Sequence, residues 1–422
     1  MAERYKIMSD PVHGFISVPH GILSRLIDTP EVQRLRRVRQ LGVGYMVFPG
    51  AEHSRFGHAL GAMALMQESI RQIQEKGTVV SPDEVEAAMA IALLHDVGHA
   101  PFSHTLEHAL IENFEHEDMS RAVIVALNDR FGGALDTALA IFDNTYERSF
   151  FHELVSSQLD MDRLDYLRRD AFYTGVIEGS VGVDRIIKTL RVHPHEGGPG
   201  SRVVIDAKGM YSVENFIIAR RLMYWQVYLH KTVIAGDHLL KAAFARVRRL
   251  GGEVDSGSPD LKFFLNQSWS AADVARADVR EAFCRLDDSD VLYSLKQWAR
   301  GLDPILADLS RRFIDRDFPR LMFLDDPPDA STLAHWTELT AEWMVSRGLS
   351  GRDEALANAA YYLAVARSSH SAYKRKGDPI GVLGRDGVLR ELSEVVDSSA
   401  LDALSVPVTK PYVCGPKEVV KS

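Results

Sequence analysis

The stretch LLHDVGHAPFSH, residues 93–104, contains three histidines and one aspartate within twelve residues. His95 and Asp96 are adjacent, and they follow an apolar run from Ala87 to Leu94 that is typical of a buried helix. Burying an imidazole or a carboxylate is costly unless the group is paired or binds an ion. We therefore expect this pair to find partners elsewhere in the chain.

The segment that leads into the pair has the signals of a helix. Ser81 can cap the N-terminus, Pro82 suits the first helical position, and Glu84 completes a capping box. Gly98 and Pro101 predict the end of the helix, which places the histidine–aspartate pair in its last turn.

Three further helices are predicted before the middle of the chain, over about 58–77, 152–170 and 212–249. Two short β-branched runs within 189–209 flank a Gly/Pro turn and predict a hairpin. A polar linker, 251–260, separates this part from a second helical region and from a tail that reads as short strands around one helix. The pattern predicts a mostly α-helical fold with a small α+β C-terminal portion.

The bulk properties exclude several classes of protein. With 422 residues the chain can form one large domain or two to three ordinary ones. The two cysteines, Cys284 and Cys414, exclude a disulfide framework and a cysteine-based zinc site. The net charge of −9 argues against a general nucleic-acid coat. There is no apolar leader, and the apolar runs are too short to span a bilayer, so we expect a cytoplasmic protein without a membrane segment.

One ion can bind both His95 and Asp96 only if other ligands arrive from elsewhere. Two segments offer such ligands: His53 and His58 in HSRFGH, and Asp160, Asp162 and Asp165 in LDMDRLD. A mixed His/Asp set suits Zn, Mn, Fe, Ni or Co better than calcium. A lone His–Asp pair would more often cap a helix or satisfy a core, so the two further segments carry the argument for a metal site.

Other residues near these segments have the chemistry of phosphate hydrolysis. His99, His104 and His116 could donate a proton or bind phosphate oxygens, although spacing alone makes His116 a solvated helix start. Arg163, Tyr166 and Asp170 share one helical face, and Arg220 and Lys231 lie three turns apart on one side of the last predicted helix. Each set could equally be a solvated, salt-bridged face.

Taken together, these motifs resemble the HD-domain superfamily of metal-dependent phosphohydrolases. HSRFGH, LLHDVGHAPFSH and LDMDRLDYLRRD correspond to successive signatures of that family. More closely, the chain resembles the deoxynucleoside triphosphate (dNTP) triphosphohydrolases, from KIMSDPVHGFI through to RRLMYWQVYLHK, at least over residues 5–235. On this basis we expect an HD phosphohydrolase domain over 1–250, with its metal-binding core at about 50–175. Residues 251–422 are expected to complete the fold and the oligomer interface.

The resemblance implies a role for each matching residue. The metal ligands are His58, His95, Asp96 and Asp162, so that His53 drops out. The catalytic histidines are His99, His104 and His116, with His116 or His104 as the proton donor. The residues around the substrate are Gln40, Leu41, Arg55, Arg163, Tyr166, Asp170, Arg220, Tyr228 and Lys231. Arg163 stands where the animal members of the dNTP triphosphohydrolase family have lysine, and Leu229 replaces a polar residue of those members.

The resemblance also implies partners and cofactors. The expected substrate is a dNTP, bound with Mg²⁺, at a site that holds a divalent Mn, Fe, Ni, Co or Zn ion. Lys6, Asp28, Gln33 and Arg36 match an activator site for a guanine nucleotide or dNTP between subunits, which implies a homo-dimer or homo-tetramer. Another HD nucleotide phosphatase or phosphodiesterase is the nearest alternative. A nucleotide sensor, or a single-stranded nucleic-acid binder that uses the basic stretch 34–39, is the non-catalytic one.

Overall fold

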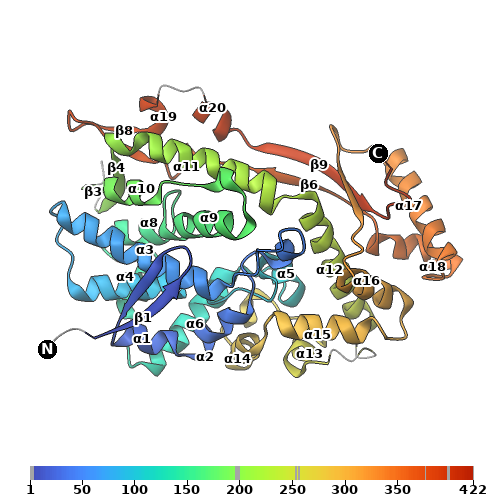
Figure 1. Ribbon diagram of the computed structural model, residues 1–422. Coiled ribbons are helices and arrows are strands. Elements are labelled where there is room, and N and C mark those ends of the chain that lie inside the picture. Colours follow the sequence, from blue (N-terminus) through green and yellow to red (C-terminus); the bar gives the residue numbers. More distant parts are fainter. Residues whose placement is uncertain are drawn as a thin grey trace.

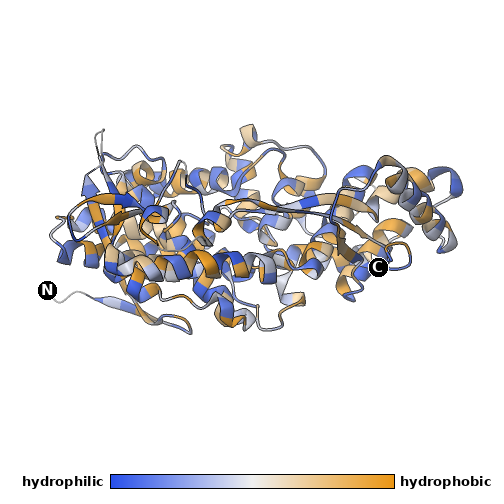
Figure 2. Ribbon diagram, turned by 90° about the horizontal axis from the view of Figure 1, so that it is seen from above, coloured by the Kyte–Doolittle hydropathy of each residue, from blue (hydrophilic) through white to orange (hydrophobic). Residues whose placement is uncertain are grey.

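The computed structural model confirms a mostly helical fold with small sheets (Figure 1). The structure describes residues 4–194, 200–251, 254, 257–375, 377–396 and 400–421. Seen after a 90° turn, the molecule is elongated, with the two termini toward opposite ends (Figure 2). In the part of the chain that the structure describes, no helix is long and apolar enough to cross a membrane.

Four helices form the N-terminal core: α3 (Arg55–Glu75), α4 (Pro82–Leu94), α6 (His116–Arg130) and α9 (Met161–Thr174). α3 packs against both α4 and α9. The last seven residues of α4, 88–94, are all buried, as the apolar run predicts. The shorter helices around them are α1 (Ile22–Ile27), α2 (Pro30–Arg34), α5 (Glu107–Leu110), α7 (Asp136–Phe142), α8 (Phe150–Val155) and α10 (Val183–Thr189).

The capping box of α4 is confirmed. Ser81 Oγ accepts from the backbone N–H of Glu84 at 3.2 Å, and the Glu84 carboxylate accepts from the backbone N–H of Ser81 at 2.8 Å. The helix ends slightly earlier than expected: His95 is its C-cap, and Asp96 lies in the turn that follows. The pair therefore sits just beyond the last helical residue rather than within the last turn.

The helix expected over 152–170 is interrupted, because α8 ends at Val155 and α9 begins at Met161. The side chain of Asp160 causes the break. Its carboxylate accepts from the backbone N–H of Ser157 at 2.8 Å and from that of Arg163 at 2.7 Å. The second bond caps the N-terminus of α9, and Asp160 itself has an extended backbone. Asp160 is thus a capping residue.

The helix expected over 212–249 is also interrupted. α11 (Met210–Met223) runs into a π-helical turn, η6 (Tyr224–Tyr228), and α12 (Lys231–Leu250) starts anew, with the ring of His230 accepting from the backbone N–H of Thr232 at 3.2 Å. The premise that Arg220 and Lys231 lie three turns apart on one continuous helix is therefore wrong.

Three small sheets complete the fold. β1 (Tyr5–Asp10) and β2 (Gly14–Pro19) form an antiparallel hairpin. The second sheet has the order β3-β4-β7-β8, with bounds β3 (Leu190–Pro194), β4 (Ser201–Asp206), β7 (Gly381–Leu383) and β8 (Leu389–Glu391). The third has the order β5-β9-β6, with bounds β5 (Arg320–Phe323), β6 (Ala364–His370) and β9 (Val408–Gly415). The predicted hairpin is confirmed by the antiparallel pairing of β3 with β4, although its turn, 195–199, lies outside the described residues.

The C-terminal half adds helices and returns to the first half through a strand. These helices are α13 (Pro259–Leu265), α14 (Ala277–Arg285), α15 (Asp288–Trp298), α16 (Pro304–Ile314), α17 (Ala330–Ser346), α18 (Arg352–Asn358), α19 (Leu392–Val395) and α20 (Ala400–Ser405). β7 pairs with β4 in parallel, so the tail joins a sheet of the N-terminal half. The predicted linker falls partly on 252–253 and 255–256, which lie outside the described residues, and the division at residue 250 stays a prediction.

Candidate metal centre and catalytic cavity

Four side chains from three helices meet at one point. His58 lies in the first turn of α3, His95 and Asp96 follow α4, and Asp162 lies in the first turn of α9. His58 Nε2 is 3.0 Å from Asp162 Oδ1 and 3.4 Å from Asp96 Oδ2. His95 Nε2 is 3.4 Å from Asp96 Oδ1 and 3.6 Å from Asp162 Oδ1. One potential ligand atom from each residue lies within 4.8 Å of the others, close enough to surround a single ion.

The other ring nitrogen of each histidine is already in use. His58 Nδ1 is 2.7 Å from Asp165 Oδ2, and His95 Nδ1 is 2.8 Å from the carbonyl oxygen of Ala92. These acceptors assign the proton to Nδ1 in both rings and turn the Nε2 lone pairs toward the carboxylates. Both Nε2 atoms are buried without a hydrogen-bond partner among the described residues. Two free imidazole lone pairs and two carboxylates fit a divalent transition metal.

A buried charge network supports His58 from behind. Asp165 is fully buried and contacts His13 Nε2 at 2.6 Å and Arg169 Nε at 2.9 Å, and Arg169 also pairs with Asp10 at 2.8 Å. Burial opposes ionisation of Asp165, but Arg169, His13 and His58 outweigh it and hold the pKa of this carboxyl well below its usual range. Asp165 therefore keeps its charge and fixes the ring of His58.

The centre attracts positive charge. Burial disfavours a charged His58, but the nearby carboxylates of Asp162, Asp165 and Asp96 raise its pKa well above the ordinary value. Burial likewise opposes the charge on Asp96, and His99, His95 and Arg55 together hold its pKa well below normal. Protons and metal ions must therefore compete for the same nitrogen atoms, so that metal affinity should fall at acidic pH.

A second group of histidines lies beside the first. The ring centroids of His99 and His116 are 3.8 Å apart, and His104 lies 4.9 Å from His99. Glu107 joins two of these rings, with one carboxylate oxygen 3.0 Å from His116 Nδ1 and the other 2.9 Å from His104 Nδ1. His116 Nε2 points to the metal centre, 3.8 Å from Asp96 Oδ1.

His99 and His116 are held in different protonation states. Burial, and then the Arg55 charge, lower the pKa of His99 well below normal, so that it stays neutral. Burial also disfavours a charged His116, but the hydrogen bond with Glu107 and the Asp96 charge outweigh it and raise the pKa of His116. Of these two rings, His116 is therefore the one better able to hold a proton at neutral pH.

The backbone around the HD pair is packed tightly against α6. A Cβ atom added at Gly98 would lie 2.3 Å from both the carbonyl oxygen of His116 and the backbone nitrogen of Ser120. The backbone N–H of Gly98 also donates to Ser120 Oγ at 3.0 Å. Only a glycine allows the first turn of α6 to approach this closely, which brings His116 up to Asp96.

Both groups of side chains face one cavity of about 340 Å³. Its lining residues are Gln40, Leu41, Arg55, Asp96, His99, His104, His116, Glu117, Asp162, Tyr166, Asp170, Tyr224 and Tyr228. Elsewhere on the lining, the hydroxyl of Tyr228 donates to Asp170 Oδ2 at 2.8 Å, and His53 Nε2 lies 2.8 Å from Asp170 Oδ1. These contacts form a polar part of the cavity wall.

Comparison with known proteins identifies the family to which this chain belongs. Residues 55–169 match the HD domain. The chain is 34% identical to YwfO of Bacillus subtilis, a protein described as uncharacterised, over 95% of this chain and 89% of that protein. The chain belongs to the HD-domain phosphohydrolase family. A crystal structure of a phosphohydrolase from Bacteroides thetaiotaomicron has a TM-score of 0.91 and 39% identity, over 98% of this chain and 100% of that one.

A relative whose name states an activity matches a smaller share of this chain. Human SAMHD1, named a deoxynucleoside triphosphate triphosphohydrolase, is 30% identical over 73% of this chain. The match spans about half of that protein, 54% of its length. The resemblance in sequence is thus confirmed at the level of the HD family.

Most of the residues predicted for the site of this HD-domain phosphohydrolase come together. The four predicted metal ligands form one cluster, and the three predicted catalytic histidines form another. Six residues predicted around the substrate line the shared cavity: Gln40, Leu41, Arg55, Tyr166, Asp170 and Tyr228. His53 lies on Asp170 rather than at the metal cluster, as the resemblance implies.

Three predicted phosphate contacts do not line that cavity in the described part of the chain. Arg163 pairs with Asp160 at the start of α9, and Arg220 donates to the carbonyl oxygen of Ala372 at 3.3 Å. Lys231 is exposed at the first position of α12. Their roles in phosphate binding stay predictions.

The sequence analysis gave Glu107 and His13 no role in the HD site. Asp165 was open as a candidate ligand, and the structure instead places it behind His58. Glu107 lies three residues after His104, a spacing that could have signalled an ion pair, but its contact with His116 depends on the loop between them. No signal in the sequence links His13 to Asp165, because the two are 152 positions apart.

Proposed function

We propose that this HD-domain phosphohydrolase hydrolyses dNTPs to the deoxynucleoside and inorganic triphosphate. The shared cavity carries the proposal: Asp96 and Asp162 of the metal cluster, the protonatable His116 and the Tyr228–Asp170 wall all border one space of about 340 Å³. The polar wall suits a sugar, and the tyrosine leaves little room for a 2′-hydroxyl. The activity for which the SAMHD1 relatives are named supports the same reaction.

The residues of the chain have separate tasks in this reaction. The four-residue cluster would hold a divalent Mn, Fe, Ni, Co or Zn ion, which when bound would supply Lewis-acid activation of the α-phosphate. Water adds to the α-phosphorus, the bond from phosphorus to the 5′ oxygen breaks, and His116 gives its proton to that oxygen. Arg55, whose guanidinium lies 2.5 Å from Asp96, presents positive charge to the phosphates, with Mg²⁺ accompanying the nucleotide.

A nucleotide activator site is part of the proposal. The four residues predicted for it lie together: Lys6 Nζ is 2.7 Å from Asp28 Oδ1, and Arg36 Nε donates to Gln33 Oε1 at 2.8 Å. Lys6 and Arg36 border a cavity of about 480 Å³. A guanine nucleotide or dNTP bound there, between subunits of a dimer or tetramer, would supply phosphates for these two cations.

The test is hydrolysis in ¹⁸O-labelled water, with each dNTP, with and without GTP. We expect deoxynucleoside and inorganic triphosphate, with the label in the triphosphate, because attack occurs at phosphorus. Asp162→Ala should abolish the reaction, whereas an exposed acid distant from the cavity, as in Asp353→Ala, should be dispensable. Release of inorganic phosphate from a monophosphate alone, or cleavage of a cyclic nucleotide alone, would replace the proposal by the other HD chemistries.

One observation weakens the nucleic-acid alternative. Within the basic stretch 34–39, Arg34 is buried, Arg37 pairs with Asp287, and Arg39 Nε lies 2.7 Å from Glu52. These cations are largely neutralised by the protein itself, so that few remain to bind a phosphate backbone.

A further inference from the structure

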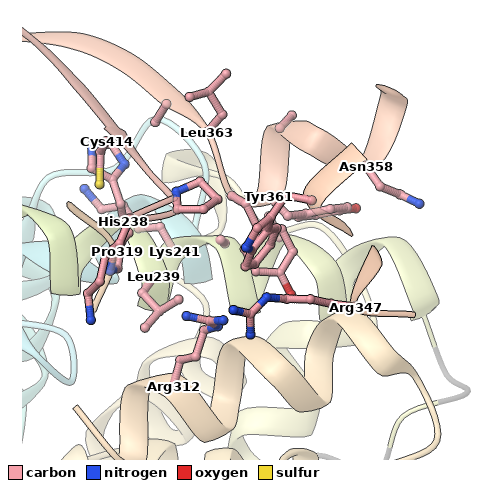
Figure 3. A pocket seen from close by; sticks show the side chains of 18 of the residues that line it. His238, Leu239, Lys241, Arg312, Pro319, Arg347, Asn358, Tyr361, Leu363 and Cys414 are labelled. Carbon is pink, nitrogen blue, oxygen red and sulfur yellow. The ribbon is translucent and has the colours of Figure 1, made fainter. Parts of the chain in front are cut away.

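A second cavity lies in the C-terminal half, away from the metal centre. Its volume is about 550 Å³, within the usual range for small-molecule sites. It is bordered by α12 and α16, by α17 and the segment after α18, and by the end of β9 (Figure 3). None of the metal-cluster residues borders it.

The cavity gathers positive charge in a protein whose net charge is −9. Its cations are Lys241, Arg249, Arg312, Arg347 and Lys417, against the acids Asp317 and Glu418. Because cations outnumber acids in a concave, partly apolar setting, the potential inside is positive and favours an anion.

Two of these cations form no ion pair in the described part of the chain, although the charge of Lys241 acts on Asp237, four residues earlier on α12. Lys417 and Arg312 share Asp317, at 2.6 and 2.7 Å, and Arg347 pairs with Glu418. For Lys241 and Arg249, both exposed, the described part of the chain provides no ion pair. Lys241 and Arg249 are eight residues apart on one face of α12, which corresponds to roughly 12 Å along the helix axis.

The rest of the lining suits a flat or apolar body between the charges. Ala245 lies between these two cations on the same face, and Ala357 and Ala360 lie across the cavity, so that small side chains leave space. Trp343 forms part of the wall, with the guanidinium carbons of Arg312 and Arg347 at 5.3 and 5.0 Å from its ring centroid. Figure 3 shows these two guanidinium groups close together beneath Tyr361.

Cations that line one cavity are stabilised by an anion bound between them. Arginine and lysine together bind phosphate with charge-assisted hydrogen bonds, and aromatic and alanine walls accept a base. We propose that this C-terminal cavity binds a small phosphate-bearing ligand of nucleotide size, with Lys241 and Arg249 as its anion contacts. The proposal does not depend on the reaction proposed for the metal centre.

The probe is AMP, titrated into the metal-loaded protein by calorimetry, with phosphate-free adenosine as the ligand control. AMP is chosen because it lacks the triphosphate and carries a 2′-hydroxyl, which the catalytic cavity should reject. We expect AMP to bind at one site per chain and adenosine to bind at least tenfold more weakly. Asp162→Ala should leave AMP binding intact, so that failure of the proposed reaction does not affect this result.

Charge reversal identifies the site. The double variant K241E/R249E should weaken AMP binding at least tenfold, whereas K296E/R300E, which reverses two exposed cations on and just after α15, should bind like wild type. If the double reversal misfolds, A245W fills the cavity at an exposed position and should also block AMP. Equal AMP affinity in wild type, K241E/R249E and A245W would overturn the proposal. The proposal would also be overturned if wild type did not bind AMP and K241E/R249E changed the oligomeric state. That result would identify the cavity as a subunit interface.

Discussion

Replacing Glu107 by glutamine tests the role of the carboxylate that joins two histidines. The Glu107 side chain is 4% exposed, and its oxygens lie 3.0 Å from His116 Nδ1 and 2.9 Å from His104 Nδ1. Glutamine has the same shape, so the substitution removes the charge and keeps the volume. His104 is 67% exposed and solvated, and the main effect should therefore fall on His116, which is 14% exposed.

The magnitude follows from the hydrogen bond that loses its charge. A hydrogen bond to a charged group contributes about 1.5–3 kcal/mol. A tenfold change in an equilibrium constant corresponds to about 1.4 kcal/mol, so the proton affinity of His116 should fall about 10- to 100-fold, which lowers its pKa. The raised pKa of His116 keeps this ring protonated to a higher pH than an ordinary histidine. Because the pKa of His116 is lower in E107Q, the variant should lose activity at a lower pH than wild type. At neutral pH we expect kcat/KM to be about 10- to 100-fold lower, with recovery toward wild type in acid.

The assay is a pH profile of dNTP hydrolysis, with the thermal midpoint of each variant as a check on folding. Glu117→Gln is a matched control, because Glu117 Oε2 lies 3.2 Å from the same His116 Nδ1 but its side chain is 59% exposed. A solvent-exposed pair contributes at most about 1 kcal/mol, so E117Q should lose at most a few-fold. If E107Q and E117Q have the same pH profile, Glu107 does not set the proton affinity of His116 and the reasoning is refuted.

Three further perturbations test other parts of the site. Chelation should abolish hydrolysis, and Asp162→Ala should lower the bound metal, measured by elemental analysis, at least tenfold; full metal content in the variant would exclude Asp162 as a ligand. Gly98→Ala should lower the free energy of unfolding in urea by about 1–3 kcal/mol, because its Cβ meets fixed backbone, whereas Gly351→Ala enters open space and should change little. Tyr228→Ala should reduce the discrimination between dATP and ATP on the order of tenfold, since a packing contact with a group as small as the 2′-hydroxyl is worth about this much in a pocket. An unchanged ratio of the two kcat/KM values would exclude Tyr228 from sugar selection.

The helices and metal ligands were predictable because their signals are local. The capping box of α4 lies within four residues, and the apolar run fixes which segment is buried. The HD pair then falls at the helix end, where two adjacent residues can reach one ion. The breaks before Met161 and Lys231 were missed because single side chains, Asp160 and His230, compete with the helix for backbone groups. A pattern of apolar residues does not register such competition.

The histidine cluster was not predictable in detail, because its loop has an unusual backbone. Phe102 and Ser103 both have positive φ, 57° and 56°, although neither is glycine. The strain of this conformation must be offset elsewhere. The backbone N–H of Phe102 donates to Asp288 Oδ1 at 2.8 Å, and that of Arg39 donates to Asp288 Oδ2 at 3.1 Å. Nothing in residues 93–104 points to an acceptor 186 positions away.

The C-terminal half therefore takes part in shaping the catalytic site. Arg34, which is 1% exposed, donates to the carbonyl oxygen of Leu286 at 2.5 Å and to that of His99 at 2.8 Å. Together with Asp288, it ties the loop that carries His99 to the segment just before α15. A chain that ended at residue 250 would keep all four metal ligands and lose Asp288 and Leu286. The four clustered ligand candidates and the histidine loop thus depend on different lengths of the sequence, because the loop that carries His99 is held by both halves.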